Sequence, residues 1–397
     1  MNAAAKPVAV LWVAAGLALG AAVSLGLARF SYALLLPPMR ADLGWSYFTA
    51  GAMNTANAAG YLVGALLTPM LLRRWGARCL LITGCVATAA LLAAHGAVLN
   101  DAPLLALRLL TGITSALVFV SGGLMAARLG AGKSNAGLVL GVYYGGTGVG
   151  IIASTLLVPS LAARTVPHAW QGAWWGLAAA ALLATLATAW ATRQQVEPPT
   201  HTVGHAQGFK SSAFAFGLAG YFMFGLGYIG YMTFTITLLR EQGLQSSLVN
   251  AYFCVLGVGV MASSWLWARL LQRHRGGLPM ALLNGLLAVA TLLPVLSTQP
   301  VVVFASGALF GCVFLSVVAS TTALVRHNLP TTAWSAGIAA FTVVFAAGQI
   351  VGPSAVGWLA DAGGGSSGGL RTGLTCSAAV LALGSLLAWW QKPIKRG

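Results

Sequence analysis

Two arginines, Arg29 and Arg108, lie inside long apolar segments of the sequence. A charged side chain in the middle of a membrane costs at least about 2.5–3.5 kcal/mol on insertion scales, so each needs a partner or a function. The acidic residues all fall in predicted loops, at Asp42, Asp101, Glu197, Glu241 and Asp361. Because a guanidinium binds carboxylate and phosphate groups through two parallel hydrogen bonds, the pair predicts an anion site.

The two arginines lie at similar depths in their segments. Counted from Pro37 and Pro103, at about 1.5 Å per helical residue, both sit roughly 7–12 Å from the same predicted membrane surface. We therefore expect them to be able to share one site. The alternative for Arg108 is that its long side chain extends to that surface, which is harder for Arg29.

Uncharged polar side chains recur at helical spacing near these arginines. Tyr47, Asn54, Asn57 and Tyr61 form one stripe, and Tyr221, Tyr228 and Tyr231 form another. The alternative is that such residues only join packed helices or mark the membrane interface. The predicted substrate-binding residues are Arg29, Tyr32, Asn54, Asn57, Tyr61, Arg108, Tyr144, Tyr228, Tyr231 and Gln349.

The segments that hold these residues are membrane-spanning helices. In this chain of 397 residues, 58% are apolar and 7% are charged, against about 25% charged in soluble domains. A span needs about 20 mostly apolar residues. The sequence predicts spans at Val8–Leu36, Ser46–Leu72, Cys79–Leu99, Leu104–Arg128, Leu138–Leu161, Trp170–Thr192, Ala213–Leu239, Ser247–Leu271, Leu278–Leu296, Val301–Val325, Trp334–Ala360 and Thr372–Trp390.

The net charge of +16 reports topology. With a cytoplasmic N-terminus, the inner loops hold Lys6, Arg73, Arg74, Arg78, Arg128, Lys133, Arg193, Lys210, Arg269, Arg273, Arg275, Arg326, Lys392, Lys395 and Arg396. The outer loops hold only Arg40, Arg164, Arg240 and Arg371. This bias predicts a multi-pass protein of the bacterial inner membrane with both termini in the cytoplasm. Its basic loops would contact anionic lipids, and we expect no nucleic-acid partner.

The spans divide into two sets of six. The longest polar stretch, residues 193–212, separates a predicted N-terminal bundle, residues 1–192, from a C-terminal bundle, residues 213–397. The predicted fold class is therefore an all-α membrane protein of two pseudo-symmetric six-helix bundles. The five cysteines are scattered, and no catalytic grouping occurs. We expect a monomer that is not an enzyme and has no metal or cofactor.

Local motifs resemble those of the major facilitator superfamily of secondary transporters. After the second span, Gly64 precedes Arg73, Arg74, Gly76 and Arg78, although Arg73 replaces the family's Asp. The resemblance implies that these residues serve gating and topology. The fourth span carries Arg108, Gly112, Ser115 and Ala116, a motif that in the family serves packing or proton handling. The fifth carries Gly132, Gly141, Gly145 and Gly150 of the antiporter motif, with Gly146 replacing its Pro.

The first two spans, including residues 26–39 and 54–61, resemble the YbfB/YjiJ-type branch of that superfamily. The resemblance implies alternating access, and with the arginines it predicts a transporter of a small organic anion. Efflux of drugs or other hydrophobic solutes is one alternative, and a non-transporting membrane sensor or scaffold is another. His95 is the one titratable candidate for proton coupling inside a span; a structural role is the competing interpretation.

Overall fold

The computed structural model describes residues 7–131, 136–162, 166–195, 210–365 and 367–394. Several residues that carried sequence arguments lie outside these ranges: Lys6, Gly132, Lys133, Arg164, Glu197, Lys395 and Arg396. Most of the predicted linker 193–212 lies outside them too. The division into bundles at that linker therefore stays a prediction.

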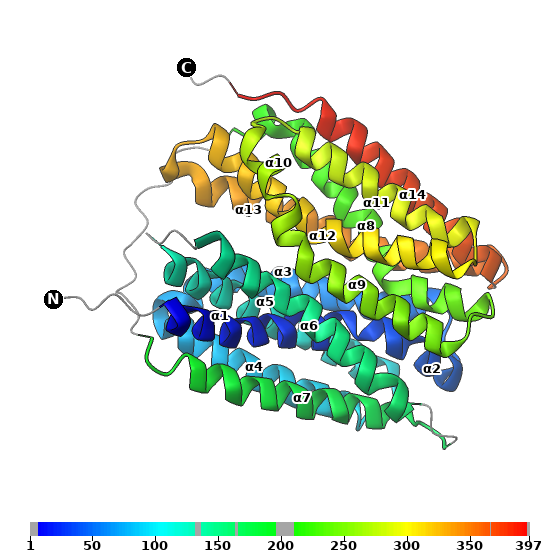
Figure 1. The fold of residues 1–397 in the computed structure, drawn as a ribbon. Coiled ribbons are helices and arrows are strands. Elements are labelled where there is room, and N and C mark those ends of the chain that lie inside the picture. Colours follow the sequence, from blue (N-terminus) through cyan, green and yellow to red (C-terminus); the bar gives the residue numbers. More distant parts are fainter. Residues whose placement is uncertain (1–6, 132–135, 163–165, 196–209, 366, 395–397) are drawn as a thin grey trace. The chain divides into compact units, whose positions relative to one another are not determined.

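The described residues form helices long and apolar enough for 12 membrane spans, which confirms the all-α membrane fold. The first span is broken into α1, η1 and α2, of which η1 is a π-helix. The helices are α1 (Pro7–Ala21), η1 (Ala22–Phe30), α2 (Tyr32–Leu43), α3 (Tyr47–Trp75), α4 (Ala77–His95), α5 (Asp101–Gly130), α6 (Ala136–Ala162), α7 (Trp170–Ala191), η2 (Ser211–Phe214), α8 (Ala215–Glu241), α9 (Ser246–Leu266), α10 (Ala268–Arg273), α11 (Leu278–Leu296), α12 (Pro300–Asn328), η3 (Thr331–Ala333), α13 (Trp334–Ala362) and α14 (Ser367–Trp389) (Figure 1).

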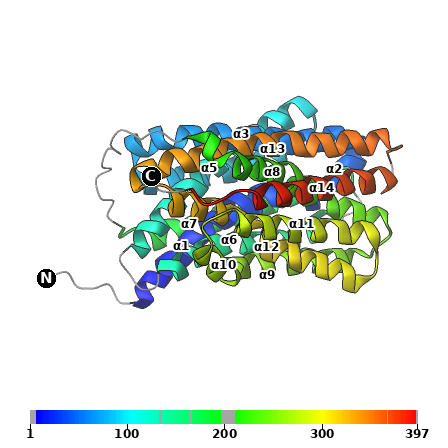
Figure 2. The same ribbon diagram turned by 90° about the horizontal axis from the view of Figure 1, so that it is seen from above.

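The chain divides into two compact units. Unit 1 comprises Met1–Leu43 and Gly60–Thr200, and unit 2 comprises Gly44–Ala59 and His201–Gly397. Helix α3 is thus shared, because its first part belongs to unit 2 and its remainder, from Gly60 onward, to unit 1. Within each unit the long helices run along a common direction, as the two views of the ribbon show (Figures 1 and 2).

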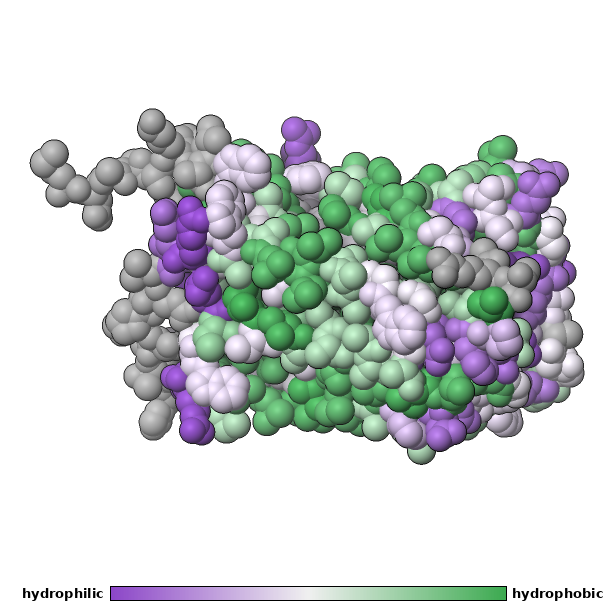
Figure 3. Space-filling model, turned by 90° about the horizontal axis from the view of Figure 1, so that it is seen from below, coloured by the Kyte–Doolittle hydropathy of each residue, from purple (hydrophilic) through white to green (hydrophobic). Residues whose placement is uncertain are grey.

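The surface fits a membrane setting. On the face shown in Figure 3, apolar side chains cover a broad middle band and hydrophilic side chains gather toward its two ends. Exposed side chains on the long helices include Leu156, Leu183 and Leu186, which are 60–68% exposed. Such side chains would be costly in water, and lipid can cover them.

Small residues let two elements of unit 1 approach backbone to backbone. A Cβ atom on Gly146 would collide with the carbonyl oxygen of Ala18, and one on Gly150 would lie 2.5 Å from the carbonyl oxygen of Ala22. A Cβ atom on Gly26 would in turn collide with Gly150. Two glycines on α6 therefore seat α1 and η1 against it, as small residues commonly do between membrane helices.

The described carboxylates correct one expectation. Asp42, Glu241 and Asp361 lie in the last turns of α2, α8 and α13, and Asp101 is the first residue of α5, so none of the four is in a loop. Each helix continues a little beyond its apolar core, because the membrane limits the length of the apolar segment and not that of the helix. The carboxylates can therefore contact the ends of neighbouring helices.

Candidate functional site

Arg29 lies near the end of the π-helix η1 and is 3% exposed. In this segment the Ser31 amide donates to the carbonyl oxygen of Gly26 at 3.1 Å, five residues back instead of four. A π-turn holds one more residue than an α-helical turn and is frequent at functional sites. The Arg29 guanidinium carbon lies 5.3 Å from the ring centre of Tyr61, within the range of a cation–π contact.

Arg108 is buried in α5 and is 1% exposed. Its Nη1 donates to the carbonyl oxygen of Ala28 at 3.1 Å. Its guanidinium carbon lies 4.5 Å from the ring centre of Tyr32. The side chain therefore stays inside the unit instead of extending to the surface, and it holds the backbone directly before Arg29.

These four side chains, Arg29, Tyr32, Tyr61 and Arg108, are called here the arginine cluster. They come from η1, α2, α3 and α5, and Arg108 reaches the carbonyl oxygen of the residue next to Arg29. Two like charges buried together repel more strongly than they would in water, because the surroundings screen them less. An anion placed beside them would relieve that repulsion and accept charge-assisted hydrogen bonds.

Two other predicted residues of unit 1 have aromatic neighbours. Tyr144, half-buried on α6, packs against the rings of Phe119 and Tyr143 at 5.8 and 5.2 Å between centres. His95 stacks on Trp174 at 4.4 Å, and its Nδ1 pairs with the carbonyl oxygen of Leu91 at 2.7 Å. The geometry of His95 is that of a packed structural side chain.

In unit 2, Tyr228 and Gln349 meet. The Tyr228 hydroxyl donates to Oε1 of Gln349 at 2.9 Å, and both side chains are buried. This bond joins α8 to α13. The sequence predicted both residues as substrate-binding, and the structure brings the two side chains together.

Tyr228 belongs to a series of nearly parallel rings, called here the ring column. Its ring lies 4.7 Å from that of Phe224 with an 18° interplanar angle. Tyr231 stacks on Phe310 at 3.9 Å and 14°. The column comprises Tyr221, Phe224, Tyr228 and Tyr231 of α8, Phe310 and Phe314 of α12, and Phe345 of α13. Sequence reasoning missed its four phenylalanines, because an apolar ring in an apolar segment gives no separate signal.

Tyr231 also lies in a chain of hydroxyl groups. Tyr252 donates its hydroxyl to that of Tyr231 at 2.7 Å, and the Tyr231 hydroxyl pairs with Oγ of Ser306 at 2.6 Å. Ser306 in turn donates to the carbonyl oxygen of Ala290 at 2.7 Å. The chain links α8, α9, α12 and α11, so these hydroxyl groups satisfy one another inside the unit.

The two asparagines of α3 are buried in unit 2. Asn54 is 4% exposed and donates through Nδ2 to Oγ1 of Thr233 at 2.6 Å, and Asn57 is 0% exposed. Thr233 donates onward to the carbonyl oxygen of Ile229. The Asn54 contact joins the first part of α3 to α8, a packing role of the kind that interhelical amides serve in membranes.

The residues of the motif after α3 divide by role. Gly64 is buried, and a Cβ atom there would lie 2.9 Å from the Cβ of Ala116 on α5. Gly76 has a φ of +76°, which favours glycine, and it separates α3 from α4. Arg78 donates to the carbonyl oxygens of Thr192 and Ala189 at 3.0 and 3.1 Å, which caps the end of α7. Arg73 and Arg74 are exposed.

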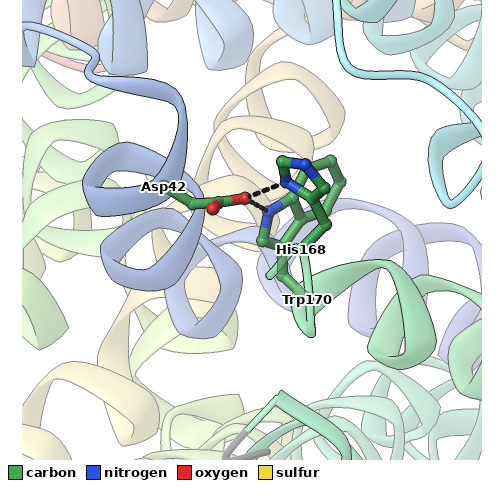
Figure 4. Close-up of polar contacts among 3 residues, drawn as sticks. All are labelled: Asp42, His168 and Trp170. Carbon is green, nitrogen blue, oxygen red and sulfur yellow. Dashed lines mark hydrogen bonds and ion pairs between the residues drawn. The ribbon is translucent and has the colours of Figure 1, made fainter. Parts of the chain in front are cut away.

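A separate polar contact in unit 1 lies at the end of α2. Oδ2 of Asp42 accepts hydrogen bonds from Nδ1 of His168 at 2.6 Å and from Nε1 of Trp170 at 2.5 Å (Figure 4). The sequence placed Asp42 in a predicted loop. Its carboxylate instead fastens α2 to the start of α7.

Comparison with known proteins decides the family. The sequence model described as "Uncharacterised MFS-type transporter YbfB" matches residues 21–389, nearly the whole chain. The chain belongs to this YbfB family of major facilitator transporters. The match confirms the resemblance seen in the motifs and extends it from the first two spans to all 12.

Solved structures show the same fold as this YbfB-family chain. A bacterial homologue of the human lysosomal transporter Spinster, inward-facing and unoccupied, is 14% identical, with a TM-score of 0.72 over 97% of both chains. The nucleoside transporter NupG is 15% identical, with a TM-score of 0.69 over 99% of this chain and all of its own. At these identities the likeness extends to the fold alone.

One curated relative carries a substrate in its name. The "Chloramphenicol resistance protein" of Streptomyces lividans is 30% identical over 162 residues, 41% of this chain. The match spans only 40% of that protein's length. Family and fold are thus those of multi-pass membrane transporters of the major facilitator superfamily, and they are not those of enzymes.

Proposed function

We propose that this transporter moves a small organic anion across the bacterial inner membrane by alternating access, as a secondary active or facilitative carrier. The observation that most supports this proposal is the arginine cluster, in which Arg29 and Arg108 are 3% and 1% exposed. Two buried cations in one cluster are costly, and an anionic cargo stabilises them while it is bound. The binding energy thus depends on the charge of the cargo.

The roles of the two arginines differ in this proposal. Arg29 contacts the anionic group, and its place in the π-helix η1 and against the ring of Tyr61 supports this role. Arg108 supplies a second positive charge and positions Arg29, because it holds the carbonyl oxygen of Ala28. Tyr32, Tyr61 and Tyr144 of unit 1 orient the remainder of the cargo at the arginine cluster. In unit 2 we propose substrate contact for Asn54, Asn57, Tyr228, Gln349 and the ring of Tyr231.

The orientation of the chain belongs to the same proposal. The excess of Lys and Arg in alternate loops supports cytoplasmic N- and C-termini. It also supports contact between the inner loops, with exposed Arg73 and Arg74, and anionic lipid headgroups. We propose that the transporter works as a monomer.

A thermal-shift screen of the purified protein tests the anion proposal. Carboxylates, sulfonates and phosphates of similar size are compared with cationic dyes. An anion present at 100 times its dissociation constant adds about 2.7 kcal/mol to the free energy of unfolding. Stabilisation by anions is expected, and stabilisation by cationic dyes alone would contradict the proposal.

The second candidate function is efflux of drugs or other hydrophobic solutes. Two observations favour it: the ring column of unit 2 and the partial match to the chloramphenicol resistance protein. Neutral aromatic antibiotics in the same screen separate the two candidates, because they would stabilise a site that depends on stacking and not on charge. The third alternative, a non-transporting sensor, gains no support from membership of a transporter family.

A further inference from the structure

The first turn of α3 is capped by a residue far away in the sequence. The backbone amides of Tyr47 and Phe48 donate to Oδ1 and Oδ2 of Asp361, at 2.9 and 2.8 Å. The next amide, of Thr49, donates to Oγ of Ser46 at 3.1 Å. The amides at the start of a helix have no partner within it. Here Asp361, at the end of α13, takes two of them.

A second carboxylate holds the same turn. The hydroxyl of Tyr47 donates to Oε1 of Glu241, the last residue of α8, at 2.5 Å. The Tyr47 side chain is 1% exposed, and its ring meets that of Phe234 edge-on at 6.4 Å. Two of the five acidic residues of the chain therefore bind one helical turn.

Behind this turn, α3 lies close against α13 within unit 2. A Cβ atom on Gly51 would collide with the carbonyl oxygen of Pro353, and one on Gly357 would lie 2.9 Å from the Cα of Phe48. Oγ1 of Thr55 pairs with the carbonyl oxygen of Ile350 at 2.7 Å and with Oγ of Ser354 at 2.8 Å. The contact runs along the first part of α3 and ends where unit 2 ends, at Ala59.

The remainder of the same helix is bound just as closely in unit 1. A Cβ atom on Gly60 would collide with the carbonyl oxygen of Leu109, and one on Gly64 with that of Ile113, both on α5. One continuous helix is therefore held at one end by α8 and α13 and at the other by α5. A change of conformation that moves α8 and α13 away from α5 must therefore bend α3 or break its contacts at one of its ends.

We propose that Asp361 and Glu241 form a carboxylate latch, which holds the first part of α3 on α8 and α13 and must release during transport. The inference rests on the proposed alternating access but not on the identity of the cargo. Charge-assisted bonds to the positive end of a helix dipole hold the latch closed. Phe48 is 48% exposed and Asp361 is only half-buried, so water can replace Asp361 on both amides when the latch opens.

Hydrogen–deuterium exchange of the full chain in lipid nanodiscs tests the latch, with Asp361→Asn as the variant. An asparagine keeps one acceptor oxygen and loses the charge. We expect amide exchange to rise at least about tenfold throughout residues 47–59, and in the stretches of α8 around Thr233 and of α13 around Ile350. Residues 60–75 of the same helix are the internal control, and their exchange should not change.

Three outcomes would overturn the latch: unchanged exchange, an increase confined to residues 47–50, or an equal increase along all of α3. The second would show a local helix cap, and the third general unfolding. Asp42→Asn is the matched control, because that carboxylate binds α7 and should leave α3 unchanged. Tyr47→Phe removes only the bond to Glu241 and should raise amide exchange over residues 47–59 less than Asp361→Asn does. Unchanged exchange in Tyr47→Phe would show that Glu241 is not part of the latch.

The exchange measurement needs no substrate, so the latch and the anion proposal fail separately. Faster amide exchange over residues 47–59 in Asp361→Asn, in a protein that no anion stabilises, would support the latch and contradict the proposed cargo. Stabilisation by an anion, together with unchanged amide exchange in Asp361→Asn, would support the proposed cargo and contradict the latch.

Discussion

Unit 1 and unit 2 differ in one kind of buried polar group. Among the described residues both units bury neutral hydroxyl and phenol groups, but unit 1 alone also buries guanidinium groups, those of Arg29 and Arg108. In unit 2 several of the neutral groups satisfy one another, as in the chain from Tyr252 through Tyr231 to Ser306. Two guanidinium groups have only donors and cannot do so. If the cargo is an anion, as proposed, this difference assigns charge recognition to unit 1 and leaves shape and stacking to unit 2.

The largest expected effect is on Arg29. Arg29→Ala should reduce uptake of the anion found in the screen by at least about 100-fold, because buried charge-assisted bonds contribute roughly 1.5–3 kcal/mol each. Uptake into proteoliposomes with equal amounts of protein measures it. Arg371→Ala, at an exposed arginine of unit 2, is the matched control and should transport normally. Normal uptake by Arg29→Ala would show that the buried charge of Arg29 has no role in substrate recognition by unit 1.

Arg108 tests whether the second arginine positions the first. Arg108→Ala should lower the free energy of unfolding by about 2–4 kcal/mol, since the carbonyl oxygen of Ala28 and the ring of Tyr32 both lose their partner. The apparent melting temperature without ligand reports it, and Arg108→Lys should recover part of the loss. Unchanged stability with abolished anion binding would instead make Arg108 a direct ligand of the anion.

Tyr231 tests whether the neutral hydroxyl groups of unit 2 contribute to stability and not to charge recognition. Tyr231→Phe keeps the ring on Phe310 but leaves the hydroxyl of Tyr252 without its acceptor. We expect a loss of about 1–2 kcal/mol in the free energy of unfolding. The shift in melting temperature caused by an anion should stay as in the wild type. A lost anion response would show that the hydroxyl chain also recognises charge.

Asp42 should have the smallest effect. Asp42→Asn weakens the bonds from His168 and Trp170 at a partly exposed site, so the free energy of unfolding should fall by only about 0.5–1 kcal/mol. Thermal unfolding of the two proteins side by side measures it. A loss as large as that of Arg108→Ala would mean that the end of α2 matters as much as the arginine cluster.

The sequence was sufficient for the number of spans and for the family, because apolar segments of membrane length and short motifs are local features. It also marked the buried arginines, since charge is rare in such segments. It did not reveal the π-turn of η1, nor the close approach of Gly26 and Gly150, which lie far apart in the sequence. Nor did it reveal the partners of Asp42 and Asp361, which lie 126 and more than 300 residues away along the chain.

The most direct test of the central claim compares wild type with Arg29→Gln in the thermal-shift assay, over a concentration series of one stabilising carboxylate. Glutamine keeps hydrogen-bond donors at this position and removes the positive charge. The account predicts that the concentration-dependent rise in melting temperature disappears in Arg29→Gln while the ligand-free protein remains folded. An equal rise in both proteins would contradict it.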